Sequence, residues 1–119
     1  MDALEWSDDE KESAREKNES LERRNKARKA LDLEPTSPAI IDSWGWVLFH
    51  QGKYEEALVE LERAYAGLKD PEVAAHIVET LWKLDRAGEA RGVLEDAELL
   101  FPENPLLERV RERVFPEEP

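Results

Sequence analysis

Two histidines and a few carboxylates are the residues of this chain whose chemistry could support a metal site or acid–base catalysis. His50 and His76 are the only histidines among 119 residues, and Asp42, Glu72 and Glu79 precede or follow them. Imidazole and carboxylate groups bind metal ions and transfer protons. However, no ligand spacing such as His-x-x-x-His places both histidines on one helix. We therefore expect ordinary, partly exposed histidines, with no metal site and no cofactor.

Other catalytic patterns are also missing from the sequence. The chain has no cysteine, which excludes thiolate nucleophiles, disulfides and cysteine zinc sites. Gly52-Lys53 lacks the second glycine and the Lys-Ser/Thr pair of a phosphate-binding P-loop, so it is predicted to be a turn. No Ser-His-Asp arrangement is evident. We predict that the chain is not an enzyme.

The charge of the chain limits its partners. With 29 acidic and 17 basic residues, the formal net charge is −12, which repels nucleic acid and anionic lipid. A protein or peptide segment with basic and apolar side chains is the expected partner, without nucleic acid and without membrane insertion. The N-terminal MDALEWSDDE has no apolar core typical of a signal peptide. A cytoplasmic protein is expected, or a periplasmic or envelope one if the chain is part of a longer protein.

Three predicted helix starts share one form, which reveals an internal repeat. Ser37-Pro38, Asp70-Pro71 and Asn104-Pro105 lie 33 and 34 residues apart. In each, the first side chain can accept hydrogen bonds from free backbone N–H groups, and proline suits the first helical position. We therefore expect a helix to begin at each proline.

Each repeat is predicted to contain two helices. The first repeat has helices over about 38–51 and 54–68, separated by Gly52-Lys53, and a last helix spans about 105–114. Apolar residues recur at the spacing of half-buried helices. The expected core residues are Ile41, Trp44, Val47, Leu48, Ala57, Leu58, Leu61, Ala64, Tyr65, Ala74, Ile77, Val78, Leu81, Ala87, Ala90, Val93, Leu94, Ala97, Leu106, Leu107, Val110 and Val114.

These features resemble the tetratricopeptide repeat (TPR). A unit of about 34 residues, with Trp44-Gly45 in its first helix, Ala57 and Ala64 in its second and a closing proline, is typical of that family. The resemblance implies an all-α solenoid of about two and a half antiparallel helical hairpins. Its parts are a charged N-terminal helical extension (1–20), a partial repeat (21–35), two repeats (37–69 and 70–103) and a C-terminal capping helix (104–115). DSWGWVLF and PEVAAHIVETLWKL are also similar to terminal repeats of bacterial envelope TPR adaptors.

The resemblance also implies a peptide-binding groove, formed by one face of each first helix. Trp44 and Trp46 are separated by about 200° of helix rotation, so Trp44 is expected in the core and Trp46 in the groove. The alternative, that Trp46 covers a neighbouring helix or is merely half-exposed, remains open. The implied groove residues are Asp42, Trp46, Phe49, His50, Glu72, His76, Glu79, Trp82 and Lys83. This aromatic surface with an acidic rim predicts a scaffold or adaptor that binds an apolar, basic segment.

The repeat pattern predicts no first helix for the partial repeat at the N-terminal end. This missing helix suggests an alternative function. The segment from Leu21 to Leu33 can form only the second helix of a repeat. Because repeat arrays need neighbouring units to cover their apolar faces, a second copy of the chain could supply the missing helix. The alternative is therefore structural self-association, as a homodimer or a helix-swapped oligomer.

Overall fold

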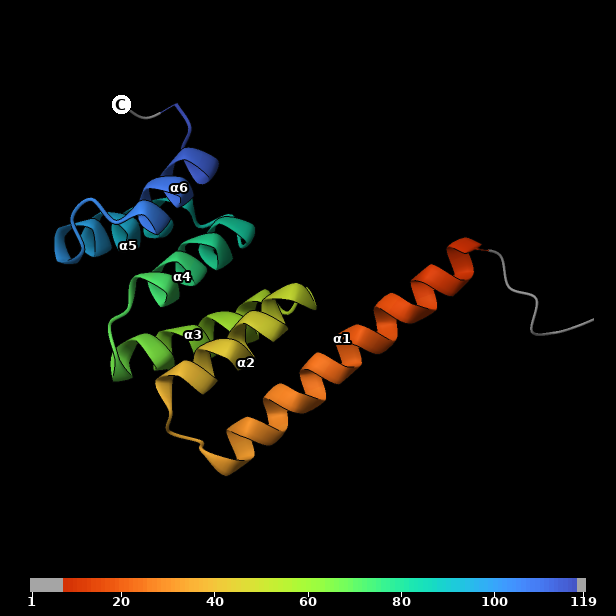
Figure 1. The fold of residues 1–119 in the computed structure, drawn as a ribbon. Helices are drawn as coiled ribbons and strands as arrows, with labels where there is room; N and C mark the ends of the chain where they lie inside the picture. The colour runs from red at the N-terminus through yellow and green to blue at the C-terminus, as the bar shows by residue number, and fades with distance from the viewer. Residues whose placement is uncertain (1–7, 118–119) are drawn as a thin grey trace, which may run out of the picture.

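The computed structural model describes the backbone of residues 8–117 and the side chains of residues 15–117. This part of the chain contains six α-helices and no strand. The helices are α1 (Asp8–Leu33), α2 (Pro38–His50), α3 (Tyr54–Gly67), α4 (Pro71–Lys83), α5 (Ala87–Leu100) and α6 (Pro105–Val114). They form a stack of helical hairpins, α2 with α3 and α4 with α5, ended by α6 (Figure 1). The expected all-α repeat fold is confirmed.

Each of the two hairpin turns contains a residue with a positive φ, but the residue type differs between them. Gly52 follows α2 with a φ of +78°, in the left-handed region that glycine adopts at little cost. The corresponding turn after α4 places Asp85 there, with a φ of 61°. Aspartate is one of the few other residues that tolerate this conformation. Both turns therefore reverse the chain within a few residues.

The three predicted helix caps are not equivalent. The Asp70 carboxylate accepts from the Glu72 N–H at 2.8 Å, and the Asn104 side-chain oxygen accepts from two backbone N–H groups of α6. The Ser37 side chain makes no capping hydrogen bond, so this part of the prediction is wrong. The start of α2 does not depend on it, because the Pro38 ring fixes φ and removes one unpaired N–H.

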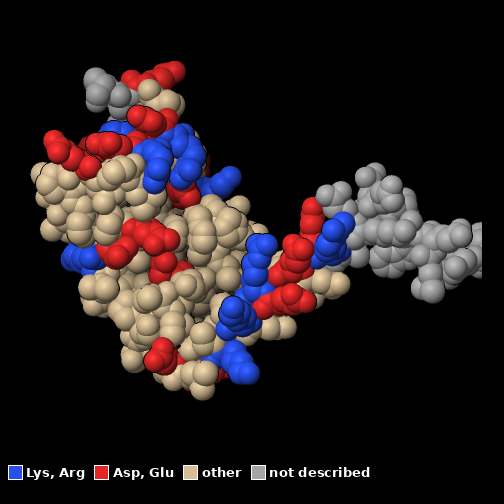
Figure 2. All heavy atoms as spheres, in the orientation of Figure 1, with Lys and Arg blue, Asp and Glu red and all other residues tan. Residues whose placement is uncertain are grey.

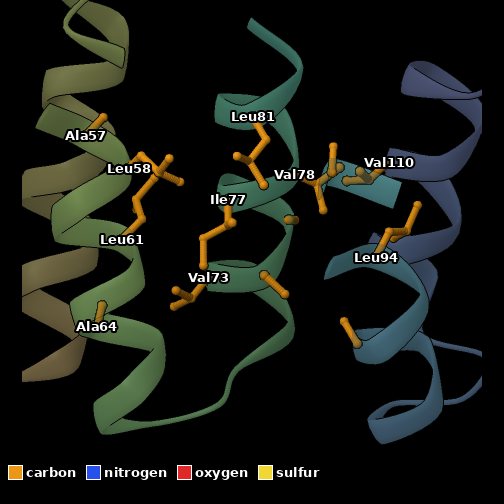
Figure 3. Packing of buried hydrophobic residues seen from close by; sticks show 14 of the residues in the cluster. Ala57, Leu58, Leu61, Ala64, Val73, Ile77, Val78, Leu81, Leu94 and Val110 are labelled. Carbon is orange, nitrogen blue, oxygen red and sulfur yellow. The ribbon is translucent and has the colours of Figure 1, made fainter. Parts of the chain in front are cut away.

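The core lies between the helices of successive hairpins. Leu58 and Leu61 of α3 point towards α4, and Ile77 and Leu81 of α4 point back towards them (Figure 3). Within the first hairpin, Gly45 brings α2 close to α3, because a Cβ there would lie 2.9 Å from Leu61 side-chain atoms. The absence of a side chain at Gly45 therefore lets α2 and α3 approach closely.

Helix α4 is more deeply buried than its sequence pattern predicts. Val73, Ala75 and Thr80 join the expected residues in the core. The reason is that α4 packs against α3, α5 and α6, so its buried surface is wider than a single stripe. The Thr80 hydroxyl donates to the His76 carbonyl oxygen at 2.7 Å, which satisfies its polar group.

Five expected core residues are only partly buried, namely Val47, Tyr65, Ala87, Val93 and Leu106.

Helix α1 leaves the stack at an angle, and only its C-terminal part lies near α2 (Figure 1). Leu31 is buried against the core, and Ala27 packs partly on it, whereas side chains 15–26 are exposed. The helix continues across the expected boundary at residue 20, and residues 1–7 lie outside the described part. That boundary therefore stays a prediction. Among the described helices, none is both long and apolar enough to cross a membrane.

Candidate binding cleft between α1, α2 and α4

A cleft of about 310 Å³ lies beside α2 and α4, and α1 forms its third side. We call it the α2–α4 cleft. Five of the nine predicted groove residues line it, together with four residues that the prediction did not include. The lining residues are Ser20, Arg23, Asp42, Ser43, Trp46, Val47, His50, Glu72 and His76. The contribution of α1 depends on the angle at which it leaves the stack, which hydrophobic periodicity does not encode.

Stacked aromatic rings form one wall of the α2–α4 cleft. The Trp46 ring lies 4.3 Å from the Phe49 ring and 3.8 Å from the His76 ring, centroid to centroid, and both pairs are nearly parallel. The His50 ring meets Trp46 edge-on at 4.9 Å. Trp46 is partly buried. It therefore lines the cleft and also packs against His76 of α4.

Asp42 and His76 join α2 to α4 at the base of the cleft. The His76 Nδ1 atom lies 2.8 Å from the Asp42 Oδ1 atom, and the two side chains are only 13% and 12% exposed. An ionised carboxylate can only accept, so Nδ1–H donates in this hydrogen bond. The pair connects the first helices of two successive hairpins and fixes the orientation of the imidazole ring.

Glu72 completes a group of three metal-ligand side chains in the cleft. It lies one helical turn before His76 on α4, and one ligand atom from each of Asp42, Glu72 and His76 can be chosen so that all lie within 4.8 Å of one another. Residues at i and i+4 share a helix face. The sequence carries this signal as Glu72-x-x-x-His76, which a search for paired histidines overlooks.

The remaining predicted groove residues lie outside the α2–α4 cleft. Glu79 forms an ion pair with Arg113 of α6. Trp82 is 45% exposed and meets the Phe115 ring edge-on, with centroids 5.5 Å apart. Lys83 is exposed at the end of α4. A second hollow of about 430 Å³ includes Trp82, Arg113 and Phe115. Of the nine residues, five thus line the cleft near α1, Phe49 stacks on Trp46 outside the lining, Glu79 and Trp82 contact residues at the α6 end, and Lys83 is exposed.

Charged side chains of both signs border the cleft. In Figure 2, Lys and Arg side chains alternate with Asp and Glu side chains along α1, and a group of Asp and Glu side chains lies over the hairpin stack. The exposed carboxylate of Glu72 on α4 and the exposed guanidinium of Arg23 on α1 both line the cleft. The Arg23 guanidinium also lies 3.9 Å from the Glu19 carboxylate on its own helix.

The comparisons with known proteins agree with the helical architecture. No protein-family model matches the chain. A stretch of 51 residues is 47% identical to a protein named TPR repeat-containing protein PA4667, from Pseudomonas aeruginosa. The match covers 43% of this chain and 9% of that protein. Together with the helical hairpins, it confirms the resemblance to the tetratricopeptide repeat family.

Proposed function

We propose that the α2–α4 cleft binds a segment of another protein that carries apolar and basic side chains. The observation that carries this proposal is the combination of an aromatic wall with two carboxylates in one cleft. Trp46 and Val47 provide apolar surface, and Asp42 and Glu72 provide negative charge. A volume of about 310 Å³ accepts a few side chains rather than a folded domain.

The charge of the ligand follows from the groups that remain available in the cleft. The Asp42 carboxylate already accepts a hydrogen bond from His76, whereas Glu72 is exposed. Glu72 is therefore the carboxylate that would pair with a ligand Lys or Arg. The net charge of −12 favours the approach of a basic segment over long distances. Arg23 on the opposite side would exchange its exposed ion pair with Glu19, at 3.9 Å, for an acidic or carbonyl group and so set the direction of the segment.

Trp46 is not expected to stack face to face with a ligand side chain. Phe49 and His76 already stack on its indole ring. A ligand would meet the edge of the indole and the neighbouring Val47 side chain. Alanine at Trp46 would also remove packing between α2 and α4, so it is a poor test of binding alone.

A substitution that fills the cleft tests peptide binding without removing the packing between α2 and α4. Ser43 lines the cleft and is exposed, and its hydroxyl donates only within α2, to the Ala39 carbonyl oxygen. Ser43→Trp should fill the cleft with little effect on the core. Val59→Trp is a matched control, because Val59 is 64% exposed on α3 and lies outside the cleft lining. Peptides should be selected from a phage-displayed random library on the full chain and their affinities measured by fluorescence polarisation.

The expected result is a set of peptides rich in Lys or Arg and apolar residues. Their affinity should fall at least about tenfold for Ser43→Trp, which corresponds to about 1.4 kcal/mol of binding free energy, and stay unchanged for Val59→Trp. Equal affinity for wild type and Ser43→Trp would contradict the proposed site. Selection of acidic peptides would contradict the proposed ligand class.

Self-association through α1 is a second candidate function. Within the part of the chain that the structure describes, helix α1 packs against α2 and no other helix, and Leu21 and Leu33 are 51% and 75% exposed. A second copy that covered this side would complete the partial repeat. Size-exclusion chromatography with light scattering, over a wide range of protein concentration, should then give the mass of two chains at high concentration. A single-chain mass at every concentration would contradict this function.

A further inference from the structure

We infer that Asp42, Glu72 and His76 form a binding site for a divalent transition-metal ion, of which Zn²⁺ fits best. The three side chains come from α2 and α4, their ligand atoms lie within 4.8 Å of one another, and all three line the α2–α4 cleft. This inference differs from the expectation of no metal site, which rested on the two histidines and nearby carboxylates coming from different helices without a recognised ligand spacing. It does not rest on peptide binding in the same cleft.

The ligand types select the metal. One imidazole nitrogen with two carboxylate oxygens is a set that Zn²⁺ accepts, with bonds of about 2.0–2.2 Å. Ca²⁺ and Mg²⁺ prefer oxygen ligands alone. Three protein ligands leave a further position for water, and the cleft beside the three residues provides the space for it. The charge of −12 also favours a divalent cation.

Two of the three ligands are already held together. Asp42 and His76 are hydrogen-bonded at 2.8 Å, and the His76 ring is stacked on Trp46, which restricts its rotation. A metal ion that bound Nδ1 would replace the proton in this hydrogen bond. His76 would stay neutral, because the ring proton would move to Nε2. The Asp42 and His76 ligand atoms would move slightly apart from their 2.8 Å separation to admit the ion, and the exposed Glu72 side chain would turn to reach it.

Glu72 is the proposed ligand that the structural role of the Asp42–His76 hydrogen bond does not explain. The Asp42–His76 hydrogen bond is explained by its role in joining two hairpins, but that role does not involve the Glu72 carboxylate. Among residues 15–117, no cation forms an ion pair with Glu72. Glu72→Gln therefore removes one proposed ligand and leaves the Asp42–His76 pair intact.

Isothermal titration calorimetry of the full chain with ZnCl₂ alone tests the site. Glu56→Gln is the matched control, because Glu56 is an exposed carboxylate in the first turn of α3 and its substitution changes the net charge equally. Wild type and Glu56→Gln should bind one Zn²⁺ per chain with the same affinity. Glu72→Gln should bind at least about tenfold more weakly, a loss typical of an altered metal shell.

The two histidines provide a second readout in the same titration. In a ¹⁵N-labelled chain, Zn²⁺ should shift the ring nitrogens of His76 strongly and those of His50 less, because His50 is outside the ligand set. Three results would each overturn the inference. These are equal affinities for Glu72→Gln and wild type, no saturable binding up to about 1 mM Zn²⁺, or a larger shift at His50. Because no peptide is present, these results are independent of the peptide-binding proposal.

Discussion

Gly45 sets the distance between α2 and α3 at a single position. A Cβ added there would lie 2.9 Å from two carbon atoms of Leu61, a side chain that is fully buried. Because Leu61 has no free space, Gly45→Ala should overpack the core, at a cost of about 1–3 kcal/mol that exceeds the gain in helix propensity. We predict a lower free energy of unfolding, measured by urea denaturation with circular dichroism.

Gly92 provides the control for this prediction. It lies in the interior of α5, and no heavy atom lies within 4 Å of a Cβ built there. Gly92→Ala should therefore stabilise the protein by about 0.5–1 kcal/mol, because alanine favours the helix. A similar effect of both substitutions would mean that close helix packing at Gly45 is not a constraint.

Side-chain capping differs among α2, α4 and α6, so alanine substitutions at the three cap positions should change the free energy of unfolding by different amounts. Asn104 caps α6 by accepting from Leu106 and Leu107 N–H groups, and Asp70 caps α4, whereas the Ser37 side chain does not cap α2. Asn104→Ala and Asp70→Ala should each lower the free energy of unfolding by about 1 kcal/mol. Ser37→Ala should change it by no more than a few tenths.

Thermal and urea denaturation of the three alanine variants would measure these differences. The variants are matched, because each removes a polar side chain immediately before a proline. An equal loss of unfolding free energy for all three variants would show that Ser37 also caps its helix in solution. It would contradict the predicted difference between Ser37 and the other two caps.

The local elements were predictable from the sequence because their signals are short-range. Proline marks the starts of α2, α4 and α6, Gly52 marks a turn, and apolar spacing identifies one side of each helix. The separation of Trp44 from Trp46 also follows from helix rotation, and Trp44 is 8% exposed. What the sequence did not provide are features that depend on three helices at once. These are the deep burial of α4 and the angle of α1.

The candidate site illustrates the same limit. The resemblance to the tetratricopeptide repeat implied Asp42, Trp46, His50, Glu72 and His76 as residues of one surface, and these five line one cleft. It did not show that Asp42 and His76 are hydrogen-bonded, because they are 34 residues apart and come from different hairpins. It also placed Trp82 in the same groove. Trp82 instead contacts Phe115, at the end of the stack, where the order of the helices determines the neighbour.

At the scale of the whole molecule, the net charge of −12 affects stability. The described ion pairs include the short-range exposed pairs Arg23–Glu19 and Arg28–Asp32, which contribute little. Repulsion among the excess acidic side chains should therefore dominate the response to salt. We predict that the Tm rises when NaCl is increased from about 10 to 200 mM, a range in which charge screening becomes short-ranged.

Differential scanning fluorimetry at several NaCl concentrations would measure this shift, with sucrose as an uncharged control for solvent effects. A Tm that falls with NaCl would contradict the prediction. It would mean that attractive ion pairs, such as Arg111–Glu98 between α5 and α6, outweigh the overall repulsion.

The most direct measurement of peptide binding in the α2–α4 cleft uses the tryptophan indole N–H signals in a ¹H–¹⁵N spectrum. The chain has four tryptophans, of which Trp46 lines the cleft, Trp44 is buried in the core and Trp82 lies near α6. During titration with a library-selected basic and apolar peptide, the Trp46 signal should shift most, and the Trp44 and Trp82 signals much less. A largest shift at Trp82, with Trp46 unchanged, would contradict the assignment of binding to this cleft.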